Sequence, residues 1–389
     1  MGFRKFQAEK IFDGKRFCEP GMVLITDEKG GILDLVDSAD AGEDIRLLPG
    51  IISPGFINCH CHLELSHMKR RIPEHTGLVD FVLKVVTERH HPEEEILQAI
   101  SDAEDEMLQN GIVAVGDICN NNLTIPQKQK RRIAYFNFIE ASGWIPAIAA
   151  GRLDRAKALL AEYDVLRYPG SKFNASIVPH APYSVSGELW KGIEPYFRDK
   201  VVSIHNQETA SEDEFFIQGT GEFNRMYQLM NIENSHHEPT RQTSLRSYYN
   251  QLLSADRVIL VHNSFTGKAD VEFALANQRS EGQLFFCLCV NANLYIENTL
   301  PAIGIFRDAG AQLVLGTDSL ASNWSLDIAA EMRTLRQRFP EISLEEMLGW
   351  ATLNGAKALD MDDRAGSFEK GKAPGIVRFD ENLTFIERL

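Results

Sequence analysis

The sequence predicts an α/β fold: a (β/α)₈ TIM barrel with a small β-sandwich domain formed by both chain termini. Three observations support this prediction. Eight apolar, strand-like stretches follow one another between residues 50 and 319. Amphipathic stretches with apolar residues at helical spacing separate most of them. Short strand-like pieces occupy the two ends of the chain. Eight such units over about 300 residues match a barrel better than an open sheet.

The eight expected strands can be placed individually. Each is an apolar run, as expected for strands of a parallel barrel, which are buried on both faces. The runs are residues 50–62, 111–119, 131–140, 173–183, 201–208, 257–264, 283–293 and 311–319. Two of the intervening segments, 93–110 and 325–339, have apolar residues at helical spacing and are expected to be helices.

The two ends of the chain lack this alternation. Before residue 50 the sequence contains the strand-like pieces "FQAEKIF", "GMVLITD" and "GGILDLV", separated by Gly, Asp and Pro. After residue 355 it returns to short turns and strands. We therefore expect residues 1–52 and 355–389 to form one small β domain, and residues 53–354 to form the catalytic barrel.

Composition narrows the classes of function. The chain has 389 residues and a net charge of −15, which argues against nucleic acid as a partner because phosphate binding requires clustered Lys and Arg. A small-molecule substrate is the expected partner. None of the six cysteines forms a C-x-x-C pair, and a reducing cytoplasm fits them best. No apolar run has the length or character of a signal peptide or membrane span.

Two histidines one residue apart end the first expected strand. Alternate residues of a strand share a face, so His60 and His62 point the same way. His205 ends the fifth expected strand and Asp318 the eighth. Functional groups of a barrel lie at the carboxyl ends of its strands, so these four side chains can converge on one divalent ion. The N₃O set suits Zn²⁺, with Fe²⁺ as an alternative.

Further polar residues fall at the same predicted rim. His262 ends the sixth expected strand, His180 lies in the fourth, and Glu208 follows His205 by three residues. His262 suits the orientation of a metal-bound water, and Glu208 suits general acid–base catalysis. Each residue alone also has an ordinary structural interpretation, such as helix or turn capping by Asp318. Five histidines near strand ends on one rim make coincidence the weaker interpretation.

At these residues the sequence resembles a known family. Six ordered stretches, "PGFINCHCHLELS", "VPHAPYSVS", "SIHNQETASEDEFF", "LVHNS", "CVNANLY" and "GTDSLASNWSLD", are similar to motifs of the amidohydrolase superfamily. The similarity is greatest to its deaminase and chlorohydrolase branch, whose members act on cytosine, guanine, S-adenosylhomocysteine and aminofutalosine. The resemblance covers nearly the whole chain. It implies a barrel, a β-sandwich built from both termini, and one metal-activated water.

The resemblance also implies roles for individual residues. Glu208 matches the proton-shuttling glutamate, and His262 matches the histidine that positions the water, with Asp318 helping to move protons. The residues that match the metal ligands are His60, His62, His205 and Asp318. The residues placed beside the substrate are Glu64, His180, Asn293, Ser319 and Asn323.

Three features bear on how far these roles transfer. "CVNAN" stands where the branch usually has "C-P-x-S-N", so the pocket wall after the seventh strand can differ. "HNQET" stands where "H-x-A-E-T" is usual, and this places Gln207 beside Glu208. The fourth strand has no lysine near His180 to carry the bridging carbamate of binuclear members, which favours a single metal ion.

The expected activity is therefore metal-dependent deamination of an amino-substituted N-heterocycle by a metal-bound hydroxide. A purine or purine-nucleoside-like compound is the expected substrate, with an aminofutalosine-like compound among the candidates. One alternative is a hydrolase with another leaving group, acting on a cyclic amide or a chlorotriazine-like compound. A second is a non-catalytic binding or scaffold protein on the same fold. The resemblance further suggests a homodimer.

Overall fold

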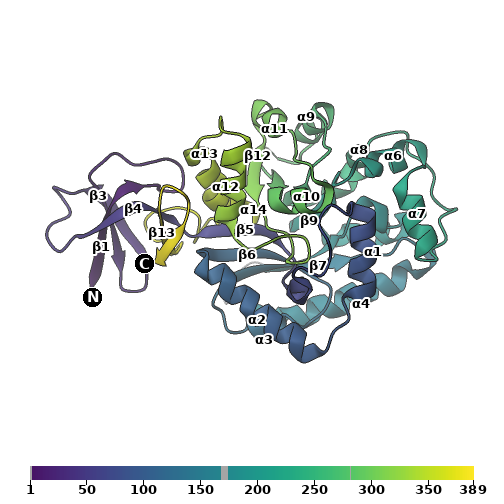
Figure 1. Ribbon diagram of the computed structural model, residues 1–389, viewed down its shortest axis with the longest axis horizontal. Coiled ribbons are helices and arrows are strands. Elements are labelled where there is room, and N and C mark those ends of the chain that lie inside the picture. The colour runs from purple at the N-terminus through teal and green to yellow at the C-terminus, as the bar shows by residue number, and fades with distance from the viewer. Residues whose placement is uncertain (1, 168–173, 281) are drawn as a thin grey trace.

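Eight parallel strands in two four-stranded sheets form the centre of the molecule (Figure 1). The computed structural model describes residues 2–167, 174–280 and 282–389. The first sheet has the order β5 (Phe56–Cys61), β6 (Ile112–Cys119), β7 (Ala134–Ala141) and β8 (Ala175–Pro179). The second has the order β9 (Val201–Asn206), β10 (Arg257–His262), β11 (Leu284–Leu288) and β12 (Gln312–Leu315).

Each of the eight expected strands is confirmed, although each observed strand is shorter than the predicted stretch. Phe173, the first residue of the fourth predicted stretch, lies outside the described residues. All six residues of β5 and all six of β9 are buried. Strands covered on both faces require such nearly continuous apolar runs, which is why the sequence revealed them.

The two parallel sheets are linked at both of their outer edges. His180 directly follows β8 and His205 lies in β9. The backbone N–H of His205 donates to the carbonyl of His180 at 3.1 Å. At the other edge, the N–H groups of Thr317 and Asp318 donate to the carbonyl of His60 at 3.1 and 3.0 Å. The carboxyl ends of β8 and β9, and those of β5 and β12, are therefore neighbours.

Helices surround these strands, and both of the helices expected from periodicity are confirmed, as α2 and α12. None of the helices in the described part of the chain is both long and apolar enough to cross a membrane. The helices are α1 (Leu78–Glu88), α2 (Glu93–Gln109), α3 (Ile125–Lys128), α4 (Ala149–Tyr163), α5 (Gly187–Ile193), α6 (Ala210–Gln218), α7 (Glu222–Leu229), α8 (Ser244–Tyr248), α9 (Lys268–Ala276), α10 (Val290–Glu297), α11 (Ile303–Asp308), α12 (Ile328–Arg338), α13 (Leu344–Gly349) and α14 (Gly355–Ala358).

Strands from both ends of the chain form a separate six-stranded mixed sheet, drawn in purple and yellow in Figure 1. Its order is β14-β13-β4-β1-β2-β3. The end of the chain reaches this sheet through β13, which pairs antiparallel with β4. The strands are β1 (Phe3–Ile11), β2 (Met22–Asp27), β3 (Ile32–Asp37), β4 (Arg46–Pro54), β13 (Ile376–Phe379) and β14 (Phe385–Arg388).

One expectation is wrong in detail: residues 50–62 are not a single strand. The stretch divides at Gly55 between β4 of the terminal sheet and β5 of the first parallel sheet. The backbone passes so close to Val113 at this point that a Cβ on residue 55 would overlap the valine side chain. Only glycine permits this approach, and the apolar pattern alone does not reveal the break.

A buried ion pair fixes the chain directly after the paired histidines. Lys128 Nζ lies 2.5 Å from Asp117 Oδ2 and donates to Asn137 Oδ1 at 2.8 Å. The other oxygen of Asp117 accepts a hydrogen bond from the backbone N–H of Leu63 at 2.8 Å. Both charged side chains are almost completely buried. The pair therefore anchors the residue that follows His62 to the end of β6.

Removing one member of this pair should destabilise the fold. We expect Lys128→Met to lower the free energy of unfolding by about 3–5 kcal/mol, because Asp117 would be left as an unpaired buried charge. Urea unfolding of both proteins measures the change. Lys268→Met, which breaks the exposed pair with Glu272, is the control and should cost less than about 1 kcal/mol. Equal, small effects of the two substitutions would contradict the anchoring role.

Candidate metal centre and active site

Four side chains from three strand ends meet at the carboxyl edge of the parallel sheets. The Nε2 atom of His62 lies 3.2 Å from Nε2 of His60 and 3.3 Å from Nε2 of His205. Asp318 Oδ1 lies 3.4 Å from Nε2 of His62 and 3.6 Å from Nε2 of His60. The structure thus brings together all four residues that the sequence predicted as metal ligands, and all four are buried.

The spacing of these atoms fits a tetrahedral metal site. With metal–ligand bonds of about 2.0–2.1 Å, two ligands of a tetrahedral zinc ion lie about 3.3–3.4 Å apart. The hydrogen bonding of His205 also fits, because its Nδ1–H donates to the carbonyl of His180 at 2.7 Å and leaves a lone pair on Nε2. Lone pairs on nitrogen atoms only 3.2–3.3 Å apart repel each other, and a cation bound between them removes this repulsion. The donor set therefore fits a divalent ion.

The pKa values of these side chains are shifted in the directions that favour metal binding. Burial holds the pKa of His62 and His205 well below the usual histidine value, and for His205 the nearby imidazoles add to this effect. Burial alone would raise the pKa of Asp318, but a hydrogen bond with His60 and favourable electrostatic interactions with His62 and His262 hold it well below its usual value. Neutral imidazoles and an ionised carboxylate are the forms that bind a metal.

The backbone is strained at the functional residues. Asp318 and His262 have φ angles of 56° and 73°, and Gln207, which precedes Glu208, has a φ of 41°. These values lie in the left-handed region, which costs a residue other than glycine about 1–2 kcal/mol. Such strain persists only where surrounding contacts hold it, and it clusters at functional sites.

Specific hydrogen bonds support the strained residues. His262 Nδ1 lies 2.9 Å from Asn293 Oδ1, so the ring donates there and Nε2 carries the lone pair. Ser322 Oγ donates to Asp318 Oδ2 at 2.6 Å. Nε2 of His262 is buried and, among the described residues, has no hydrogen-bond partner. This lone pair is thus available to a ligand beside the four donors.

Glu208 lies on the cavity side of the same cluster. Its Oε1 atom is 3.6 Å from Nε2 of His262. Burial, followed by the negative charges of Asp318, Glu212 and Glu297, raises the pKa of Glu208 well above its usual value. A raised pKa lets the carboxyl group keep its proton to higher pH than an exposed glutamate does, and a general acid needs that proton.

Gln207 ties Glu208 to the helices around it. Its Nε2 atom donates to Asp213 on α6 and to Asp270 on α9, both at 3.0 Å. Its backbone N–H donates to Glu212 Oε1 at 2.9 Å. The glutamine that distinguishes this sequence from the usual motif is thus a cross-link between two helices, directly before the candidate shuttle.

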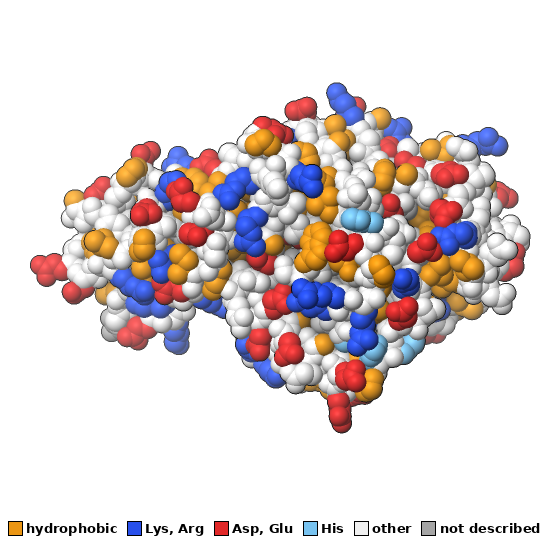
Figure 2. Space-filling view, viewed as in Figure 1, with side chains coloured by type: hydrophobic (Ala, Val, Ile, Leu, Met, Phe, Trp, Pro, Cys, Tyr) orange, Lys and Arg blue, Asp and Glu red, His pale blue; other side chains and the backbone are white. Residues whose placement is uncertain are grey.

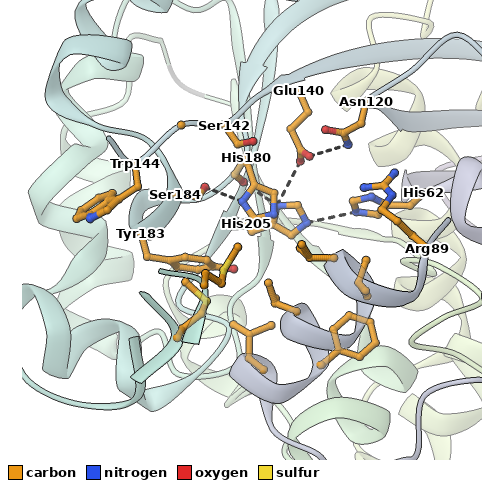
Figure 3. Close-up of a pocket in the computed structure, with 18 of the residues that line it drawn as sticks. His62, Arg89, Asn120, Glu140, Ser142, Trp144, His180, Tyr183, Ser184 and His205 are labelled. Carbon is orange, nitrogen blue, oxygen red and sulfur yellow. Dashed lines mark hydrogen bonds and ion pairs between the residues drawn. The ribbon is translucent and has the colours of Figure 1, made fainter. Parts of the chain in front are cut away.

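A cavity of about 360 Å³ opens above the cluster. Figure 3 shows His62, His180 and His205 on one side of it and Trp144 and Tyr183 on another. Residues of α7 and of the segment after it complete the wall: Tyr227 on α7 stacks on Trp144 with ring centroids 5.3 Å apart. Over the exterior, acidic and basic side chains are interspersed, with hydrophobic side chains gathered near the middle of the face in Figure 2.

The residues expected beside the substrate divide into two groups. Glu64, His180 and Ser319 line the cavity. Asn293 instead holds His262, and Asn323 is occupied within its own loop, where its Nδ2 donates to the carbonyl of Thr317 at 2.7 Å. The structure therefore places Asn293 and Asn323 behind the cavity wall, as supports of the residues that face it.

Sequence reasoning missed several residues of the cavity. Arg89 on the segment after α1 pairs with the buried Glu64 at 2.6 Å, and Trp144 follows β7. Glu140 lies at the carboxyl end of β7 and also faces the cavity. The strand-end rule that identified the histidines would have selected Glu140, whereas no local pattern marks Arg89 or Trp144.

The metal-ligand assignment predicts graded losses of zinc affinity. Asp318→Ala removes one of the four donors and should weaken zinc binding by more than about 100-fold. Ser322→Ala removes only a hydrogen bond to that donor and should weaken it by about 10–100-fold. Competition with a chromogenic chelator measures both constants. Asp318→Ala with the affinity of the unmodified chain would refute the assignment.

The buried Glu212 predicts a pH dependence of stability. Burial raises its pKa to about 7 in the folded state. The folded chain therefore retains a proton that the unfolded chain loses near pH 4.5, so this contribution to stability is lost as pH rises from about 4.5 through 7. Glu212→Gln should remove about 2–3 kcal/mol of the decline in unfolding free energy between pH 4.5 and 8.

Urea unfolding at the two pH values measures this difference. The control is Glu214→Gln, an exposed glutamate on the same helix. It should follow the unmodified chain at both pH values. An equal decline in Glu212→Gln and in the unmodified chain would show that Glu212 does not titrate in this way.

Comparison with known proteins places the chain among enzymes of one family. An adenosine deaminase of Helicobacter pylori is 25% identical over 344 residues, which cover 87% of this chain and 80% of that protein. The crystal structure of H. pylori aminofutalosine deaminase in complex with methylthio-coformycin superimposes with a TM-score of 0.81 at 22% identity, over 97% of this chain and 92% of that chain.

A zinc complex of atrazine chlorohydrolase from Arthrobacter aurescens TC1 gives a TM-score of 0.72 at 18% identity, over 96% of this chain and 86% of that chain. At such identities the likeness between structures concerns the fold. The sequence match to the amidohydrolase family, in contrast, extends over residues 51–388 and so includes all four candidate metal ligands. The chain belongs to the amidohydrolase family.

Proposed function

We propose that this chain is a metal-dependent aminohydrolase that releases ammonia from an amino-substituted N-heterocycle of the purine-nucleoside type. The observation that carries the proposal is the convergence beside one cavity of three imidazoles, an ionised carboxylate and a buried carboxyl group whose pKa is raised. The first four residues suit a metal ion that activates water. The last suits proton donation to a heterocycle.

The proposal includes a closed (β/α)₈ barrel and a division into two domains. Hydrogen bonds between the outer strands at both edges of the parallel sheets support closure. We assign residues 53–354 to the barrel, and residues 1–52 with 355–389 to a small domain in which the terminal sheet folds as a sandwich. The pairing of β13 with β4 supports the second assignment.

We propose Zn²⁺ as the bound ion, with Fe²⁺ as the alternative. Three histidine nitrogens and one carboxylate oxygen at near-tetrahedral spacing favour zinc. When bound, the ion would lower the pKa of a coordinated water and supply the nucleophile. The residues that would hold it are His60, His62, His205 and Asp318.

The chain's own residues would then move the protons. Glu208 has a buried carboxyl group whose pKa is raised by burial, and it would donate its proton to a ring nitrogen of the substrate. His262 presents a lone pair at Nε2, because its Nδ1–H is occupied by Asn293. The pKa of His262 is lowered by burial to about 4, so the ring stays neutral and acts as an acceptor that orients the attacking water. Asp318 is the third member of this proton-transfer group.

The nature of the cavity and of the relatives supports a nucleoside-like substrate. A cavity of about 360 Å³ with aromatic and aliphatic walls and a few convergent polar groups is typical of a small-molecule site. The sequence relative and the structural neighbour most relevant here are described as deaminases of adenosine and aminofutalosine. Both substrates carry an amino group on a purine ring, which is the group that the proposed chemistry replaces.

A different leaving group is the second candidate. The structural similarity to an atrazine chlorohydrolase favours it, since the same metal centre can serve displacement of chloride. Hydrolysis of a cyclic amide requires the same groups. A non-catalytic scaffold is the least economical interpretation, because it assigns no use to a complete set of donors and to a buried Glu208 whose pKa is raised.

Measurement of ammonia release tests the proposed function. Zinc-loaded protein should release ammonia from at least one class among amino-purines, amino-pyrimidines and adenosine-type nucleosides. Glu208→Gln should retain zinc but lose at least about 100-fold in kcat, at the lower end of the range for general acid–base catalysis. Glu104→Gln, another buried glutamate remote from the cavity, controls for packing and should retain activity.

Either of two results would contradict the proposal. If zinc is bound stoichiometrically and no compound of the panel releases ammonia, the proposed deamination is wrong. The chlorohydrolase-like or amide-opening alternative would then be favoured. Normal turnover by Glu208→Gln would remove the proton-shuttle role while leaving the reaction class in place.

A further inference from the structure

Glu140 is a buried carboxylate that the proposed chemistry does not use. It lies at the carboxyl end of β7 and lines both the main cavity and an adjoining cavity of about 440 Å³. Figure 3 shows its side chain between Asn120 and His205, directed toward the space in front of them. The ring of His205 thus separates Glu140 from the other candidate metal ligands, and Glu140 forms part of the wall of both cavities.

One oxygen of this carboxylate has no partner. Oε2 accepts a hydrogen bond from Asn120 Nδ2 at 2.8 Å, whereas Oε1 is buried and, within the described residues, accepts none. The nearest ring nitrogen is Nδ1 of His205 at 3.9 Å, and that N–H already donates to the carbonyl of His180 at 2.7 Å. An unsatisfied buried carboxylate oxygen is costly, so a donor from a ligand is the expected partner.

The surroundings indicate the kind of donor. Asn120 and Ser142, both neutral hydrogen-bonding side chains, line the two cavities beside Glu140. The adjoining cavity is also lined by Arg152 and Arg155, whose positive charges disfavour a cationic group there. Hydroxyl groups are neutral and both donate and accept hydrogen bonds. They match a carboxylate flanked by an amide and a hydroxyl.

We propose that Glu140 is a specificity-determining residue that accepts hydrogen bonds from the vicinal hydroxyl groups of the substrate's sugar. This inference rests on the proposed function, because only a nucleoside-like substrate places a diol beside the reacting ring. Two adjacent hydroxyls can both donate to the open lone pairs of Oε1 and to the remaining lone pair of Oε2. Glu140 then selects ribonucleosides over free bases and over nucleosides whose sugar lacks these hydroxyl groups.

The test compares two substrates in three proteins. Values of kcat/KM for ammonia release are measured with adenosine and with 2′,3′-dideoxyadenosine, using zinc-loaded unmodified chain, Glu140→Ala and Glu140→Gln. The unmodified chain should prefer adenosine by about 10- to 100-fold, the range of hydrogen bonds to a charged acceptor. In Glu140→Ala the ratio should fall to near one through loss of activity on adenosine alone. Glu140→Gln, which keeps one acceptor, should lie between.

Each other outcome overturns the inference. A ratio near one in the unmodified chain shows that the diol is not recognised, whatever the variants do. Equal losses on both substrates in Glu140→Ala indicate a structural role, and if that variant does not fold, an unchanged ratio in the isosteric Glu140→Gln leads to the same conclusion. If the unmodified chain releases ammonia from neither nucleoside nor from any other heterocycle, the proposed function fails and the assignment of Glu140 fails with it.

Discussion

The carbonyl of His60 accepts hydrogen bonds from two successive backbone N–H groups, those of Thr317 and Asp318, and this contact joins the first parallel strand to the last. It places the Asp318 carboxylate within 3.6 Å of the His60 ring. The approach depends on Gly316, where a Cβ would lie 2.9 Å from the Cβ of His60 and 2.8 Å from Cys287 Sγ. A side chain at position 316 would therefore separate the two strand ends and remove one donor from the cluster.

This close approach creates an electrostatic problem that a cation would resolve. Asp318 is buried and ionised, and the imidazoles around it are held neutral by burial. An uncompensated buried carboxylate is costly, and hydrogen bonds offset only part of that cost. The negative charge of Asp318 also adds to burial in raising the pKa of the nearby Glu208. A bound divalent ion would therefore stabilise the fold as well as supply chemistry, since it binds the folded chain and lacks a formed site in the unfolded one.

The sequence predicted the parts of the structure that depend on local patterns. Buried parallel strands are continuous apolar runs, and the residues at their carboxyl ends share a rim, so His60, His205 and Asp318 could be associated with one another from the sequence alone. The break at Gly55 could not be predicted, because it arises from the approach of Val113 on another strand. The cavity walls could not be predicted either, since they form by packing of α1, α7 and the segment after β7, which lie far apart in the sequence.

Resemblance and geometry differ most at the polar residues around the site. The motif containing Asn293 marks an important position, and the structure shows that its side chain acts on His262 and not on the cavity. Such a distinction depends on where a side chain points, which spacing along the chain cannot specify. Glu140 is the converse case: its position at a strand end is visible in the sequence, but only the unpaired Oε1 distinguishes it from an ordinary buried acid.

The Gln207 network connects these features. Its amide binds carboxylates on α6 and α9, and α6 also carries Phe215, which packs against Trp144 in the cavity wall. Glu208 and one wall of the cavity are therefore parts of the same hydrogen-bonded and packed unit. Three of the four candidate metal ligands, His60, His62 and Asp318, belong to a different unit, the strand ends joined through the carbonyl of His60. Changes in α6 and α7 can consequently alter the cavity beside Glu208 while leaving the four candidate ligands in place. Such a separation is expected where one fold serves many substrates.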